Sequence, residues 1–209
     1  LINAAGTYTY LSASLMPRPV VEAIESASRR YVNLGELQGA VGRKISALLG
    51  CEAALVTAGA ASALMLATAA CVAGKDRSKI ARLPETTGMK NEVIIPKAHR
   101  NGYDHAIRNV GVRLVEVDTL DDITRVAGER TAMMAYFNVH GPEGKIKVDE
   151  YAALGKKLAI PTLVDAAADI PPVENYTRFL KMGYDLAAFS GGKVLCGPQC
   201  SGMLLGRKD

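Results

Sequence analysis

Short apolar runs rich in β-branched and aromatic residues alternate along this chain with longer segments whose apolar residues recur at helical spacing. Runs of the first kind are typical of buried strands, and a period of three to four residues is typical of an amphipathic helix. The predicted strands are residues 53–56, 92–96, 113–117, 131–137, 161–165, 185–189 and 202–205. The predicted helices are residues 17–31, 61–72, 101–110, 120–127 and 148–158.

Strands that alternate with helices predict an α/β fold, with a mostly parallel seven-stranded sheet covered by helices on both faces as a three-layer α/β/α arrangement. Residues 77–91 are polar and irregular, and they predict an exposed loop. We divide the chain into an N-terminal segment and helix, residues 1–30, and a large domain, residues 31–209. Ligands of such sheets bind beyond the carboxyl ends of the strands, so the residues there are the first candidates for a site.

Composition narrows the class of protein. The chain has 209 residues, 49% apolar and 22% charged, a balance typical of one large globular domain. The net charge of +4 is dispersed, unlike the basic stripe of a nucleic-acid-binding protein. We find neither an apolar run long enough to span a membrane nor a secretion signal, and we expect a cytoplasmic protein. Because the chain begins at Leu1 and stops at Asp209 just after a predicted strand, we expect a longer parent with a C-terminal small domain.

The four cysteines do not predict a metal site. Cys196 and Cys200 have a spacing that some zinc sites use, but no second close pair of cysteine or histidine completes a tetrad. We therefore expect reduced, packed cysteines at positions 51, 71, 196 and 200 and no bound metal.

A small-residue turn follows the strand at residues 53–56. Gly59, Ala60 and Ala61 open a predicted helix, where backbone N–H groups can approach a phosphate and the helix dipole favours an anion. The turn matches neither the Walker pattern nor GxGxxG. The alternative is that these residues only let the helix pack closely.

Polar residues also follow the strands at residues 92–96 and 131–137. His99 lies at a strand-to-helix turn, where an imidazole can stack on a flat ring or serve as a capping or core histidine. Asn138 and His140 precede a Gly-Pro turn, and they face a substrate or only shape that turn.

The most informative candidates are an aspartate and a lysine. Asp165 ends an apolar strand, where a buried carboxylate is expensive, unless it caps the turn at residues 166–171. Lys193 lies in a glycine-rich, apolar turn, and a lysine in a semi-dry pocket can form a Schiff base, whereas an ordinary lysine is a solvated surface group. A lysine imine and an acidic partner for a pyridinium nitrogen are the protein's share of pyridoxal-phosphate chemistry. Their occurrence with the other strand-end residues predicts such a site.

At this point the chain resembles a known family. It is similar to the large domain of fold-type-I pyridoxal-phosphate enzymes, in the branch of bacterial selenocysteine synthase, L-seryl-tRNA(Sec) selenium transferase, and relatives such as D-glucosaminate-6-phosphate ammonia-lyase. The matching segments are INAAGT at 2–7, EAALV at 52–56, LGKK at 154–157, VD at 164–165, FSGGK at 189–193 and GPQ at 197–199.

The resemblance implies a role for each candidate. Lys193 would form the Schiff base with pyridoxal 5'-phosphate and then carry the Cα proton, while Asp165 would keep the pyridine nitrogen protonated. The other implied cofactor-binding residues are Gly59, Ala60 and Ala61 by backbone N–H, Ser190 by its hydroxyl and His99 over the ring face.

Departures from selenocysteine synthase favour a different activity within the branch. The Asn-Leu-Gly-Arg-like stretch expected after the opening motif is Tyr10-Leu11-Ser12-Ala13-Ser14 here, and these 209 residues do not include the helical tRNA-binding domain expected before that motif, as truncation of a longer chain would also explain. We therefore expect a lyase that removes an α-proton and eliminates a β-hydroxyl from an amino acid or amino sugar acid, releasing ammonia and a 2-keto acid. The alternatives are the tRNA-dependent selenium transferase and a non-catalytic α/β ligand-binding domain. The resemblance also implies a homo-oligomer with sites at a subunit interface.

Overall fold

The structure, a computed structural model, describes residues 2–209; Leu1, with which the predicted N-terminal segment begins, lies outside the described residues. Seven strands form one sheet in the order β1-β7-β6-β5-β4-β2-β3. The strands are β1 Ala53–Thr57, β2 Glu92–Pro96, β3 Arg113–Val117, β4 Thr131–Phe137, β5 Thr162–Asp165, β6 Leu186–Ser190 and β7 Gly202–Gly206. Among the strands of residues 2–209, β7 runs in the opposite direction to the other six, so the predicted mostly parallel sheet is confirmed.

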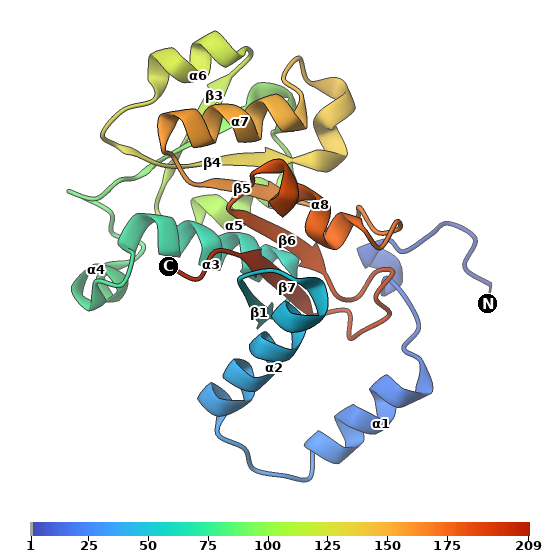
Figure 1. The fold of residues 1–209 in the computed structure, drawn as a ribbon. Coiled ribbons are helices and arrows are strands. Elements are labelled where there is room, and N and C mark those ends of the chain that lie inside the picture. The colour runs from blue at the N-terminus through green and yellow to red at the C-terminus, as the bar shows by residue number, and fades with distance from the viewer. Residues whose placement is uncertain (1) are drawn as a thin grey trace.

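Helices cover both faces of the sheet, as Figure 1 shows. The α-helices are α1 Arg18–Ala27, α2 Leu34–Leu49, α3 Ala60–Ala73, α4 Arg77–Arg82, α5 His105–Arg108, α6 Leu120–Val126, α7 Val148–Leu158 and α8 Asn175–Met182. One buried cluster joins α3 and α5 to the sheet, and a second joins α6, α7 and α8 to the opposite face, with the end of α2 packed against it. Strands β2, β5 and β6 contribute alternate residues to the two clusters, because successive side chains point to opposite faces.

Central strands carry the core. In β2, Val93 and Ile95 belong to the cluster under α3, while Ile94 between them belongs to the cluster under α7. All seven residues of β4 are buried, as a parallel strand covered on both faces requires. These buried strands fix the positions of the residues at their carboxyl ends, where the candidate site lies.

Several predicted elements need correction. Residues 77–82 form helix α4 rather than loop, with Asp76 as N-cap, its side chain accepting from the backbone N–H groups of Ser78 and Lys79. The predicted helix at 101–110 is a 3₁₀ turn, Gly102–Asp104, followed by the short α5. Helices α2 and α8 were not predicted. The predicted helix at 17–31 is shorter, because α1 ends at Ala27.

The N-terminal part of the chain packs least. Helix α1 buries none of its residues, and Figure 1 shows it standing apart from the sheet. Its Ile24 is 44% exposed, and Tyr31 after it is fully exposed. None of the helices within residues 2–209 combines the length and apolar character needed to cross a bilayer.

Candidate functional site

Three elements meet at the start of helix α3. Thr57 at the end of β1 and Ser190 at the end of β6 both pair with Gly202, the first residue of β7. A Cβ at position 202 would lie 2.4 Å from the carbonyl carbon of Gly59 and 2.7 Å from the nitrogen of Ala60. Only glycine therefore allows the sheet to approach the helix start this closely. The sheet edge brings Ser190 to the same place as the predicted phosphate-binding turn.

The first turn of α3 has the properties of an anion site. Gly59 is the N-cap with a φ of 93°, and no side chain caps the helix. Thr57 Oγ1 donates to the Gly59 carbonyl over 2.9 Å and shapes the turn. The N–H groups at the start of a helix have no intrahelical acceptor and carry partial positive charge. Gly59, Ala60 and Ala61 are thus placed where the sequence predicted a phosphate contact.

Asp165 ends β5 and is a partly buried carboxyl. Its Oδ1 accepts a hydrogen bond from the Ala167 N–H at 2.9 Å. Burial raises the pKa of Asp165 to about 6, although this N–H group and the Lys193 ammonium act in the opposite direction. The carboxylate is therefore under-compensated, and a hydrogen-bond donor with positive charge would stabilise its ionised form.

Lys193 lies in the loop after β6, next to β5 in the sheet. The loop is held by backbone hydrogen bonds, from Gly191 N–H to Ser201 O and from Gly197 N–H to Gly191 O, both at 2.8 Å. Lys193 is half-buried, and its charge lowers the pKa of Asp165 and of Asp169. The predicted aspartate and lysine therefore lie within electrostatic reach of one another.

His99 is fully buried in this conformation. Its ring contacts Tyr136 edge-on, with the ring centroids 4.3 Å apart, and its Nδ1 accepts from the Phe137 N–H at 3.3 Å. Nε2 has no hydrogen-bond partner and lies beside Gly144, whose added Cβ would approach it to 3.1 Å. Burial, followed by the nearby His140, lowers the pKa of His99 to about 4, so the ring is neutral at pH 7. Stacking on a cofactor ring stays a prediction and would require the covering residues to move.

The sequence did not single out Asp169, and it left the roles of Asn138 and His140 open. Asn138 donates from its Nδ2 to Asp169 Oδ1 at 3.0 Å, which links the end of β4 to the turn after β5. His140 interacts with Glu143 at 3.2 Å, and its proximity is a minor influence that opposes the burial-raised pKa of Asp165. Burial raises the pKa of Asp169. The available signal was a second acid four positions after Asp165 and before two prolines, within the stretch 166–171 that is predicted only as a turn.

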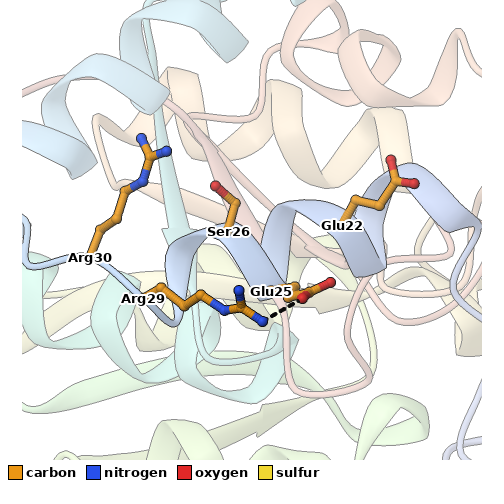
Figure 2. A pocket seen from close by; sticks show the side chains of 5 residues that line it. All are labelled: Glu22, Glu25, Ser26, Arg29 and Arg30. Carbon is orange, nitrogen blue, oxygen red and sulfur yellow. Dashed lines mark hydrogen bonds and ion pairs between the residues drawn. The ribbon is translucent and has the colours of Figure 1, made fainter.

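Other features of the structure lie away from this edge. An open depression is lined by Glu22, Glu25, Ser26, Arg29 and Arg30, all from α1 or the residues just after it (Figure 2). Within residues 2–209 no cluster of three or more metal-ligating side chains is found. The four cysteines are free, and Cys200 is exposed rather than packed as predicted.

Comparisons with known proteins place this geometry in a family. The family model described as L-seryl-tRNA selenium transferase (SelA) matches residues 1–209. D-glucosaminate-6-phosphate ammonia lyase of Salmonella typhimurium is 31% identical, over 100% of this chain and 58% of the lyase. A 5'-C-glycyluridine monooxygenase-decarboxylase of a Streptomyces species is 32% identical, over 100% of this chain and 54% of that protein. L-seryl-tRNA(Sec) selenium transferase of Proteus mirabilis is 28% identical, over 100% of this chain and 49% of the transferase.

Solved structures agree with the sequence relatives. A structure of D-glucosaminate-6-phosphate ammonia-lyase superposes with a TM-score of 0.91 at 30% identity, covering 99% of this chain and 58% of that chain. A Campylobacter jejuni structure containing N'-pyridoxyl-lysine-5'-monophosphate has a TM-score of 0.58 at 20% identity, over 81% of this chain and 38% of its own, and supports the fold alone. The chain thus spans about half the length of the curated relatives it matches. The predicted family resemblance and α/β fold are confirmed.

Proposed function

The chain belongs to the L-seryl-tRNA selenium transferase family, and we propose that it forms the pyridoxal-phosphate-binding part of a lyase. Its relatives include an ammonia lyase, a monooxygenase-decarboxylase and selenium transferases. The proposed reaction removes the α-proton and the β-hydroxyl of an amino acid or amino sugar acid. The water lost with the hydroxyl is returned by hydrolysis, so the net products are ammonia and a 2-keto acid.

The observation that carries this proposal is the placement of Asp165 at the end of β5 and of Lys193 in the loop after the neighbouring β6, within electrostatic reach of one another. The carboxyl of Asp165 has its pKa raised to about 6 by burial, and the Lys193 ammonium is one of the groups that lowers it. A protonated pyridine nitrogen is a donor that would stabilise the ionised carboxylate here. The amine of Lys193, in the loop after the neighbouring strand, would hold the aldehyde of the same ring.

The residues present fit the cofactor at its phosphate end as well. The N–H groups of Gly59, Ala60 and Ala61 would bind the phosphate, with the hydroxyl of Ser190 as a further donor, because Gly202 lets these elements converge. When bound, pyridoxal phosphate supplies a sink for the electron pair left at Cα. Lys193 would hold the aldehyde carbon through its Nζ and move the α-proton. Asn138 and His140, near the same edge, are candidates for the substrate side.

The substrate class rests on the relatives. The names of the Salmonella and Streptomyces relatives describe an ammonia lyase and a monooxygenase-decarboxylase, and their identities to this chain differ by one percentage point, 31% against 32%. The structural superposition with the ammonia-lyase favours the lyase, with a phosphorylated amino sugar acid as substrate. The selenium transferase remains the second candidate, because the family model carries that description.

We also propose a homo-oligomer and a cytoplasmic location. Apolar side chains of the N-terminal region are exposed, including Val21 at 47%, Ile24 at 44% and Tyr31 at 105%, and association would cover them. The four free cysteines accord with a reducing compartment.

The first test measures covalent attachment of the cofactor. The protein is mixed with pyridoxal 5'-phosphate, reduced with borohydride and digested, and the modified peptide is located by mass spectrometry. We expect the label on Lys193, and we expect Lys193→Ala to lose it while Lys156→Ala, a change at an exposed position of α7, keeps it. Turnover should fall by roughly 10²–10⁴-fold in Lys193→Ala, the usual contribution of a general base. An unlabelled wild-type protein would contradict the proposal.

The second test identifies the reaction. The cofactor-loaded protein is incubated with a panel of amino sugar acids, their phosphates and hydroxy amino acids, and ammonia, keto acid and oxygen are measured together. Ammonia with an equimolar keto acid and no oxygen uptake is the expected result. Oxygen uptake would replace the lyase with an oxygenase. Salt-sensitive binding of seryl-tRNA without ammonia release would favour the transferase.

A further inference from the structure

The N-terminal arm, residues 2–16, touches the protein at one informative place. Most of its side chains are exposed, including Ile2 at 96%, Tyr10 at 80% and Leu15 at 93%. Ala13 is the exception, with 4% of its surface exposed, and Ser14 beside it is half-buried. The arm is therefore anchored at residues 13 and 14.

The anchor reaches the loop that carries the lysine. Ser14 Oγ donates a hydrogen bond of 2.6 Å to the carbonyl oxygen of Gly192, across a sequence separation of 178 residues. Ser12 and Ala13 adopt left-handed backbone angles, with φ of 63° and 59°. Residues with a Cβ adopt this conformation rarely; here their N–H groups donate to the carbonyls of Thr9 and Tyr8, which ends the 3₁₀ turn Thr9–Leu11 just before the anchor.

Gly192 cannot shift freely. A Cβ at this position would lie 2.5 Å from Cα of Gln199, so its backbone lies directly against the returning part of the loop. Its carbonyl belongs to the peptide group that joins it to Lys193. Because that group is planar, a bond that orients the carbonyl also orients the amide of Lys193. Ser14 and Gln199 thus confine the peptide that precedes the lysine.

We propose that Ser14 is a positioning residue that holds the Lys193 loop and couples the N-terminal arm to the site. The hydroxyl fixes the Gly192–Lys193 peptide plane and with it the direction in which the lysine leaves the backbone. The catalytic meaning of this contact rests on the proposed function, but the contact itself does not.

The first experiment needs no cofactor. Trypsin cleavage after Lys193 is followed by mass spectrometry in wild type, Ser14→Ala and Ser14→Thr. Cleavage after Lys156, within helix α7, reports global unfolding in the same digest. We expect Ser14→Ala to raise cleavage after Lys193 by about five- to tenfold, since one partly buried hydrogen bond is lost, without raising cleavage after Lys156. Ser14→Thr should restore protection.

The matched control is Ser28→Ala. Ser28 Oγ also donates to a backbone carbonyl, that of Glu25 at 2.8 Å, but on exposed α1. This variant should cleave after Lys193 at the wild-type rate. Equal rates in wild type and Ser14→Ala would overturn the proposal, as would a parallel rise at Lys193 and Lys156 that Ser14→Thr does not reverse.

The second experiment uses the cofactor-loaded protein. The pH midpoint of the absorbance change of lysine-bound pyridoxal phosphate reports the environment of Nζ. We expect this midpoint to shift in Ser14→Ala and to return in Ser14→Thr, whereas a purely structural role would leave it unchanged. If the wild-type protein binds no cofactor, the proposed function fails while the protease result still decides the role of Ser14. If it loads normally and the midpoint is unmoved in Ser14→Ala, the positioning role is wrong.

Discussion

Asp104 and Asp165 are two carboxyls beyond the carboxyl ends of parallel strands, and their surroundings are opposite. Asp104, in the 3₁₀ turn after β2, is 1% exposed and bonds to Arg100 at 2.6 Å and to Arg108 at 2.8 Å. Asp165 accepts from one backbone N–H, at 2.9 Å. Burial raises the pKa of both carboxyls, but at Asp104 the hydrogen bonds from Arg100 and Arg108 more than offset it and the pKa is lowered.

The difference separates a structural carboxylate from a candidate functional one. Asp104 is satisfied within its own chain and ties the turn to α5 and, through Arg100, to Glu116 of β3. The negative charge of Asp165 is only partly compensated, so ionisation of this carboxyl destabilises the folded state. Groups held in such a state are concentrated at functional sites, because a ligand completes their compensation. By burial alone, Asp104, which is 1% exposed, would have been the stronger candidate for a perturbed carboxyl than the partly buried Asp165.

The largest expected effect is on turnover. Asp165→Asn should reduce the rate of keto-acid formation by roughly 10²-fold or more, since a neutral amide cannot keep a pyridine nitrogen protonated. Asp104→Asn, measured per molecule of bound cofactor, should change the rate less than about fivefold. Steady-state assays on the substrate found by the product screen would measure both, and equal losses would end the distinction between the two carboxyls.

The next effect is on stability, with opposite signs. In the cofactor-free protein at pH 8, Asp165→Asn should raise the free energy of unfolding, up to roughly 3 kcal/mol, because a pKa near 6 instead of about 3.9 means that ionisation is disfavoured on folding. Asp104→Asn should lower it by about 2–3 kcal/mol through loss of charged hydrogen bonds. Urea unfolding would measure each change, and a destabilised Asp165→Asn would contradict the comparison.

The pH dependence of the free energy of unfolding tests whether Asp165 is the perturbed carboxyl. Because the pKa of Asp165 is raised in the folded state, its contribution to stability is present below pH about 4 and is lost as pH rises through about 6. The stability difference between Asp165→Asn and wild type should therefore grow from pH 4 to pH 7 and then level off. His99, whose pKa is lowered, acts in the opposite direction but is present in both proteins and cancels. A difference that is flat with pH would mean that Asp165 does not titrate in this range.

The smallest effect concerns the phosphate end of the site. Gly202→Ala places a Cβ 2.4 Å from Gly59 and should push the start of α3 away, lowering affinity for pyridoxal 5'-phosphate about tenfold. Gly128→Ala is the control, because its Cβ would meet nothing within 4 Å. Equilibrium dialysis would measure both affinities. Unchanged affinity in Gly202→Ala would mean that the start of α3 does not bind the phosphate of the cofactor.

The sequence predicted best those features that a short run of neighbouring residues encodes. The strands were found within a residue or so of their bounds, because apolar β-rich runs are a local property of buried strands. Helix α2 was missed because Gly35, Gly39 and Gly42 weaken the helical pattern. Gly42 has a tertiary reason, since a Cβ there would lie 2.5 Å from the carbonyl oxygen of Ala54 in β1. Asp169 was missed because its link to Asn138 joins two strand ends far apart in sequence.

The sequence by itself determined the alternation of strands and helices, the lysine and aspartate at strand ends, and the family motifs around them, because each is written in a short run of residues. Only the tertiary structure decided that β5 and β6 are neighbours, that β7 runs antiparallel between β6 and β1, and that the arm reaches Gly192. It also decided which carboxyl is neutralised by arginines and which is left partly uncompensated. The physical reason is that pKa and ligand fit depend on what surrounds a group in space, and long-range packing sets those surroundings.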